Sequence, residues 1–154
     1  MAIADLLEPQ RLMLSSSATS KKRALEHLSE LMASAGESFS AGHVFDSLLV
    51  RERLGSTGLG HGVAIPHARY QGATDAIGAF MRLDEPVDFD AMDREPVDLV
   101  FGLLVPENCT DEHIQILAQL AELFSDKELR SALRTADGTD EVLQLIGSAH
   151  PQSG

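Results

Sequence analysis

A histidine that follows a proline, close behind a glycine-rich run, is the feature of this sequence with the clearest chemical potential. His67 follows Pro66, and the run of glycines and hydroxyl residues at 55–62 precedes them. An imidazole is a good nucleophile near neutral pH, and a glycine-rich loop lets backbone N–H groups approach an anion. Beside a rigid proline, one ring nitrogen can be held against a backbone carbonyl while the other stays free. The pattern predicts phosphoryl transfer onto His67.

Several nearby residues are suited to hold a phosphoryl group. Ser56 and Thr57 add hydroxyl donors to the loop, Gly58 leaves its backbone accessible, and Arg51 lies at the end of the preceding predicted helix. The plain alternative is that these glycines only let the chain turn sharply between a helix and a strand. The convergence of donors, a cation and a rigid histidine is more than a turn requires, and it favours a phosphate-binding loop.

Other ligand sites fit the same residues poorly. His61 and Gly62 stand where a Walker loop needs Lys and Ser or Thr, and Val63 takes the place of the third glycine of the dinucleotide pattern. Three imidazoles can bind zinc, so His61, His67 and His113 form the main chemical rival. The sequence has no HExxH helix and no nearby cysteine to complete such a site. We therefore expect neither a metal nor a cofactor.

The composition limits both the architecture and the partners. A chain of 154 residues with 44% hydrophobic content suits one domain around one core. The net charge of −12 disfavours nucleic acid and anionic lipid, and it favours a basic protein partner. The single cysteine, Cys109, cannot form an internal disulfide. There is no secretion signal and no apolar segment of about 18 residues, so we expect a cytoplasmic protein without membrane insertion.

Helical periodicity and capping residues place most of the elements. Helices are predicted after Ser20, ending by Gly36, and after Ser40, running to residues 54–55. Further helices are predicted from Thr110 or Asp111, from a capping box at 125–128, and over 140–146. Strands are predicted at 63–65, 76–83 and 97–105, and the last is apolar enough to be covered on both faces.

These elements predict an α/β fold in which a mixed β-sheet is flanked by helices on both faces. Residues 1–148 form a single compact domain in this interpretation. The polar tail at 149–154 offers nothing to pack, and we expect it to be disordered.

With these residues assembled, the segment 51–67 closely resembles the phosphorylation-site signature of the fructose/mannitol-type enzyme IIA domains of the phosphoenolpyruvate-dependent phosphotransferase system. The similarity continues at 24–28, at 96–106 and at 111–113, and it covers nearly the whole chain. The chain is most similar to the stand-alone, nitrogen-regulatory branch of that family. It departs from the pattern at Ala68-Arg69, where relatives often carry glycine and then a varied residue.

The resemblance implies a mannitol-type enzyme IIA fold and a phosphohistidine carrier that needs no cofactor. His67 would accept the phosphoryl group on Nε2 from a histidine phosphocarrier protein, HPr-like and of the nitrogen branch. Arg51 and His113 match the family's basic residues around the phosphohistidine, and regulatory target proteins would bind one phosphorylation state. In a first alternative the group passes to an enzyme IIB of a fructose or mannitol uptake system. In a second, the chain is a protein-binding module that is not phosphorylated.

Overall fold

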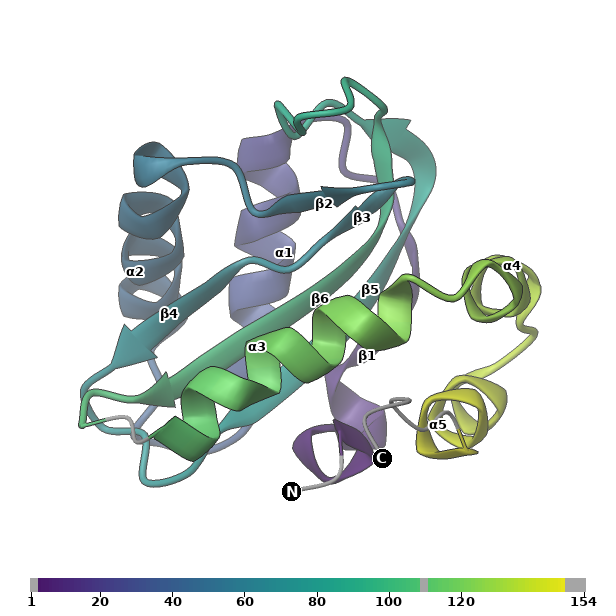
Figure 1. The fold of residues 1–154 in the computed structure, drawn as a ribbon. Helices are drawn as coiled ribbons and strands as arrows, with labels where there is room; N and C mark the ends of the chain where they lie inside the picture. The colour runs from purple at the N-terminus through teal and green to yellow at the C-terminus, as the bar shows by residue number, and fades with distance from the viewer. Residues whose placement is uncertain (1–2, 109–110, 149–154) are drawn as a thin grey trace.

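The computed structural model describes residues 3–108 and 111–148, with the backbone alone for 112–114, and its centre is a six-stranded sheet (Figure 1). The main path of the sheet runs β1-β5-β6-β3-β2, and β4 pairs with β6 beyond the end of β3. β5 and β6 are antiparallel, whereas β3 and β4 run parallel to β6, so the sheet is mixed as predicted. The strands are β1 Leu12–Ser16, β2 Gly58–Gly60, β3 Val63–Ala64, β4 His67–Tyr70, β5 Ile77–Val87 and β6 Val97–Pro106.

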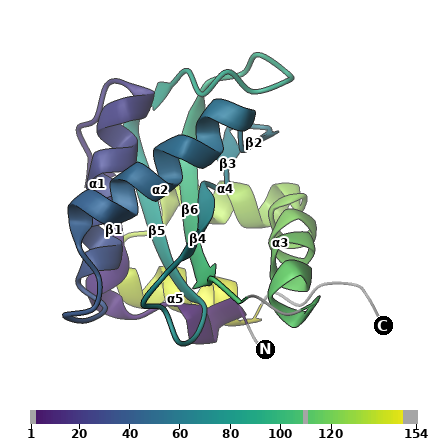
Figure 2. The ribbon, with the colours of Figure 1, turned by 90° about the vertical axis from the view of Figure 1, so that its left-hand side faces the viewer.

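Helices cover both faces of this sheet, which confirms the predicted layers. α1 and α2 lie on one face, and α3, α4 and α5 lie on the other (Figures 1 and 2). Within the part of the chain that the structure describes, no helix is both long and apolar enough to cross a membrane. The helices are α1 Lys21–Ala33, α2 Ala41–Leu54, α3 Asp111–Phe124, α4 Lys127–Thr135 and α5 Thr139–Ser148, with short 3₁₀ turns at Ile3–Leu6 and Pro9–Arg11.

The central strand β6 divides the core into two clusters. Phe101 and Leu103 point into the cluster beneath α3, α4 and α5, and Val100 and Leu104 point into the cluster beneath α1 and α2. All four side chains are fully buried. Alternate residues of a strand face opposite sides, so burial on both faces requires a nearly continuous apolar sequence, as the strand prediction assumed.

The caps of the first two helices agree with the prediction. The Ser20 hydroxyl accepts a hydrogen bond from the backbone N–H of Arg23 at the start of α1. Ser40 accepts in the same way from His43 at the start of α2. Such caps satisfy N–H groups that have no partner within the helix.

The capping box predicted at 125–128 is wrong by one residue. α4 is capped by Asp126, whose carboxylate accepts from the backbone N–H groups of Glu128 and Leu129. Ser125 is engaged elsewhere, because its hydroxyl donates to the carbonyl of Glu122 in the last turn of α3. A carboxylate at the N-terminus of a helix also interacts favourably with the helix dipole.

The strands differ most from prediction around the histidine. The sequence places His67 after the end of a strand, but β3 ends at Ala64 and His67 opens a new strand, β4. The glycine run contributes a strand of its own, β2, which pairs antiparallel with β3. β5 continues to Val87, beyond the predicted end at residue 83. The predicted cap at Thr110 and the predicted disordered tail at 149–154 lie outside the described residues.

Candidate functional site

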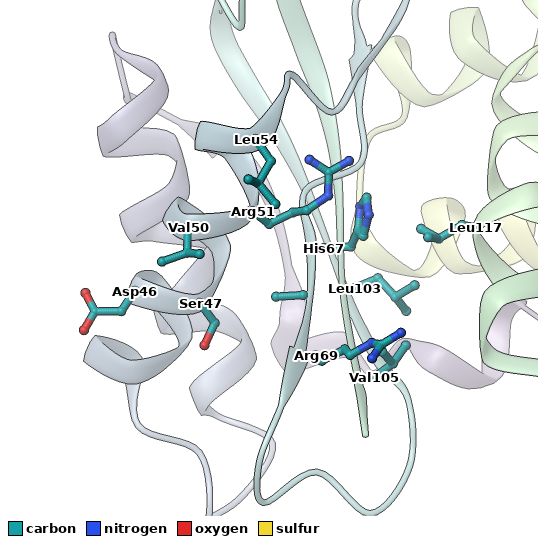
Figure 3. A pocket seen from close by; sticks show the side chains of 11 residues that line it. Asp46, Ser47, Val50, Arg51, Leu54, His67, Arg69, Leu103, Val105 and Leu117 are labelled. Atoms are coloured by element: carbon teal, nitrogen blue, oxygen red, sulfur yellow. The ribbon is translucent and has the colours of Figure 1, made fainter. Parts of the chain in front are cut away.

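A pocket of about 640 Å³ opens along β4 (Figure 3). Residues of α2, on one face of the sheet, and of α3, on the other, contribute to its lining. Its walls are mainly apolar, with Leu54 from α2, Leu103 from β6 and Leu117 from α3. His67 and Arg51 line the same pocket. The structure thus brings together two of the residues that the sequence analysis singled out.

The ring of His67 is oriented by the backbone immediately before it. Its Nδ1 lies 2.8 Å from the carbonyl oxygen of Ile65. A carbonyl oxygen can only accept a hydrogen bond, so Nδ1 carries the proton and Nε2 is the unprotonated nitrogen of the neutral ring. This arrangement agrees with the expected orientation of one nitrogen by a backbone carbonyl. Pro66 is fixed in turn, because its carbonyl accepts from the backbone N–H of Leu103 at 2.9 Å.

The surroundings of His67 favour the neutral ring. Burial, which disfavours the charged form, lowers the pKa of His67 from its ordinary value of 6.5, and the hydrogen bond to Ile65 works against this effect. The positive charge of Arg51 lowers the pKa further, and the negative charge of Glu52 raises it. The net lowering increases the fraction of His67 that is an uncharged nucleophile at neutral pH.

Arg51 belongs to the last turn of α2 and extends toward the His67 ring (Figure 3). Its Nη1 donates a hydrogen bond to the carbonyl of Gly55 at 3.0 Å. The guanidinium carries further N–H donors beyond this bond, and it is charged at any physiological pH. It is therefore suited to bind an anion held on the ring.

The hydroxyl residues of the glycine loop point away from this pocket. The Ser56 hydroxyl donates to the carbonyl of Phe89 at 2.6 Å and accepts from the backbone N–H of Gly58. Thr57 is buried, and both its hydroxyl and its backbone N–H donate to the carboxylate of Glu52. An anion on His67 would find these donors already engaged. The predicted role of Ser56, Thr57 and Gly58 in binding phosphate stays a prediction.

The two remaining histidines of the sequence analysis have different outcomes. His113 lies in the first turn of α3, but its side chain falls outside the part that the structure describes. His61 lines a second pocket, together with Asp98 and Arg134, and not the pocket of His67. The zinc site built from His61, His67 and His113 would need His61 and His67 to converge, and they line different pockets.

Two residues of this region were missed by the sequence analysis. Arg69 lies on the same face of β4 as His67 and lines the pocket. Residues two apart in a strand share a face, so predicting a strand at 67–70 would have placed Arg69 beside His67. Glu52 is buried in the last turn of α2, where an anion is unfavourable because of the helix dipole. An acidic residue at this end of a predicted helix indicates that its carboxylate is stabilised by residues outside the helix.

Comparisons with known proteins find similar sequences over nearly the whole chain. Residues 5–149 match the family described as "Phosphoenolpyruvate-dependent sugar phosphotransferase system, EIIA 2". A nitrogen regulatory protein of Pseudomonas aeruginosa is 44% identical over 142 residues, which is 92% of each chain.

Solved structures give the same picture for the fold. The crystal structure of the nitrogen regulatory protein IIA-Ntr from Neisseria meningitidis superposes with a TM-score of 0.88 and 46% identity, over 94% of this chain and 98% of that one. The IIA mannitol structure from Escherichia coli superposes with a TM-score of 0.76 and 26% identity, over 91% of this chain and 98% of that one. Both structures thus match more than nine-tenths of this chain.

Proposed function

This chain belongs to the EIIA 2 family of the phosphoenolpyruvate-dependent sugar phosphotransferase system, and from that membership we propose that it carries a phosphoryl group on His67 as a nitrogen-related regulatory protein. The observation that carries the proposal is that Nδ1 of His67 is engaged by the Ile65 carbonyl, which leaves Nε2 as the nitrogen for the phosphoryl group. This nitrogen belongs to a ring that lines an open pocket and is oriented by Ile65.

The transfer step follows from the tautomer of His67. The Nε2 lone pair attacks the phosphorus of a phosphohistidine on the carrier protein, and the N–P bond of the carrier breaks as the new bond forms. The carrier imidazole leaves with the electrons of its bond. The proton stays on Nδ1. The Ile65 carbonyl accepts a hydrogen bond from Nδ1 and so stabilises the positive charge that develops on the attacking ring.

Little covalent chemistry beyond this step falls to the protein, because the transition state of phosphoryl transfer is loose. What remains is alignment and stabilisation of negative charge on the phosphoryl oxygens. We assign Arg51 to that stabilisation, because it lines the pocket of His67 with donors to spare. By family resemblance we assign a similar role to His113, and we retain Ser56, Thr57 and Gly58 as predicted phosphate-binding residues.

The walls of the pocket suit a protein as phosphoryl donor. Val50 and Leu54 of α2 are 59% and 81% exposed at the rim, beside the phosphoryl acceptor. Exposed apolar side chains next to a reactive group are typical of a docking surface for another macromolecule. The net charge of −12 would draw a basic carrier protein toward this chain at low salt.

Sequence similarity favours the regulatory role over sugar uptake. The chain is 44% identical to a nitrogen regulatory protein and 26% identical to the mannitol protein. Phosphorylation adds about two negative charges at pH 7, enough to change which target protein binds the surface around His67. In the alternative function, the group passes from His67 to an enzyme IIB of a fructose or mannitol system.

The deciding experiment is phosphorylation in a reconstituted system. The chain is incubated with phosphoenolpyruvate, the nitrogen-branch enzyme I and its phosphocarrier, and the adduct is tested for the acid lability and base stability of a phosphohistidine. We expect the wild type and His43→Ala to be labelled and His67→Ala not to be. His43 is a matched control because it is an exposed histidine on α2.

Three outcomes separate the functions. An unlabelled wild type would favour a binding module, and a labelled His67→Ala would refute the assignment of the acceptor. Rapid loss of label to an added fructose- or mannitol-type enzyme IIB would favour the sugar-uptake role. Arg51→Ala is expected to slow labelling without unfolding the protein.

A further inference from the structure

A buried carboxylate lies next to Arg51 in the chain and is absent from the transfer step described above. The Glu52 side chain is 3% exposed, and its Oε2 lies 2.8 Å from Nζ of Lys21. Thr57 donates its hydroxyl and its backbone N–H to the same carboxylate. A buried anion is costly unless it is paired and hydrogen-bonded, and the last turn of a helix is an unfavourable place for it. Lys21 and Thr57 offset these costs.

Hydrogen bonds lead from this carboxylate to the imidazole. The Thr57 carbonyl accepts from the backbone N–H of Ile65 at 3.0 Å. The Ile65 carbonyl then accepts from Nδ1 of His67 at 2.8 Å. Glu52 thus fixes Thr57, Thr57 fixes Ile65, and Ile65 fixes the ring, although Glu52 lies outside the lining of the pocket.

Two consecutive residues of α2 hold the start of the glycine loop. Arg51 donates to the carbonyl of Gly55 at 3.0 Å, and Glu52 accepts from Thr57 two positions further along the loop. The loop is therefore tied to the last turn of α2 on both sides of Ser56. Arg51 lines the pocket, and Thr57 is connected to the His67 ring through Ile65. The hydrogen bonds of Arg51 and Glu52 to the loop therefore also set where the guanidinium lies relative to His67.

We propose that Glu52, paired with Lys21, is a positioning residue of the phosphoryl site that holds the ring of His67 in one orientation and one tautomer through Thr57 and Ile65. Its effect on transfer rests on the proposed function, whereas its effect on the ring does not. Without the charged carboxylate, Lys21 loses its partner and the Thr57 hydroxyl and N–H lose one of their two accepting oxygens, so the loop can shift relative to α2. The Ile65 carbonyl then no longer selects Nδ1 as the donor.

The test compares two variants that break different parts of this connection. Glu52→Gln removes the charge that pairs with Lys21, and Thr57→Val removes one donor while keeping the ion pair. Asp90→Asn is the matched control, because Asp90 also faces Lys21, at 3.8 Å, but its side chain is 79% exposed. Asp90 has a φ of 57°, a conformation that asparagine tolerates well. A second control, Val142→Ala, destabilises the buried core at α5 without touching this network.

The first readout is the ¹⁵N NMR spectrum of the His67 imidazole in the unphosphorylated protein, at a pH where the ring is neutral. The wild type, Asp90→Asn and Val142→Ala are expected to show one tautomer with the proton on Nδ1. Glu52→Gln and Thr57→Val are expected to show a mixture of both tautomers. The second readout is phosphoryl transfer, where both variants lower kcat by about ten- to a hundredfold because the nucleophile is misplaced. KM for the carrier stays at the wild-type value.

The outcomes are distinct from those that test the function itself. A wild-type tautomer and kcat in Thr57→Val, or in a folded Glu52→Gln, would overturn the proposal. The same spectral change in Val142→Ala would also overturn it, because loosening of the whole fold would then suffice. An unlabelled wild type would count against the phosphocarrier function alone, since the imidazole spectra would still decide the role of Glu52.

Discussion

Substitution of Gly102 by alanine should destabilise the protein, because α1 packs directly over this point of β6. A methyl group built at Gly102 meets the terminal methyl of Met32, and it lies 2.7 and 2.8 Å from the two methyl carbons of Leu28. Both side chains are fully buried, so they cannot swing into solvent. Only a shift of α1 away from the sheet, or strained rotamers, can accommodate the extra carbon.

The size of the effect follows from two opposing contributions. Overpacking a well-filled core costs about 1–3 kcal/mol. Alanine restricts the unfolded chain more than glycine does, which returns about 0.4–1 kcal/mol. The net loss of roughly 1–2 kcal/mol corresponds to a decrease in Tm of roughly 2–8 °C for a domain of this size.

The assay is urea denaturation followed by circular dichroism, with Gly36→Ala as the control. A methyl group at Gly36 has one neighbour, Phe39 at 4.0 Å, so this variant should be as stable as the wild type or slightly more stable. Met32→Ala should cost less in the Gly102→Ala background than alone, because the new methyl occupies part of the space it vacates. Equal stabilities of Gly102→Ala and Gly36→Ala, or strict additivity with Met32→Ala, would refute the packing argument.

Three further predictions concern acid stability, helix capping and docking. The pKa of His67 is lowered in the folded state, so as the pH falls the His67 ring becomes protonated in the unfolded chain before it does in the folded protein. Between about pH 8 and about pH 5.5 the wild type should thus lose more stability in urea than His67→Gln, and parallel losses would contradict this. Asp126→Ala should lower the unfolding free energy by about 1 kcal/mol, and Ser125→Ala should lower it by less. The reverse order would show that Ser125 is the capping residue of α4. Leu54→Gln, at an 81% exposed position, should raise KM for the carrier while Tm stays unchanged, and an unchanged KM would place docking elsewhere.

Local sequence signals were sufficient for the helices. Ser20 and Ser40 cap helices where the sequence predicted them, because a cap depends on groups only a few residues apart. The strand at 97–105 was predictable for a related reason, since a strand covered on both faces needs an apolar residue at nearly every position. The chosen capping residue of α4 failed because Ser125 and Asp126 are both good caps, and the local pattern cannot rank them.

The strands around the site could not be derived in the same way. β2 consists of glycines and one leucine, a composition with low strand propensity, and its pairing with β3 makes it a strand. β4 exists because residues 67–70 pair with the end of β6, a partner that periodicity within the segment does not reveal. The sequence placed Arg51 near His67 through the helix that ends at residue 54. It missed Glu52, whose partner Lys21 comes from another helix.

The pairing of β4 with β6 makes the orientation of His67 depend on a part of the chain that is synthesised after it. His67 pairs with Leu103, and the carbonyl of Pro66 is held by the N–H of that same residue. When residues 51–67 of a nascent chain have just emerged from the ribosome, β6, the strand that helps to orient the ring, has not yet emerged. Under the proposed function, a partly synthesised chain would be a poor acceptor of the phosphoryl group, because its imidazole is not yet oriented.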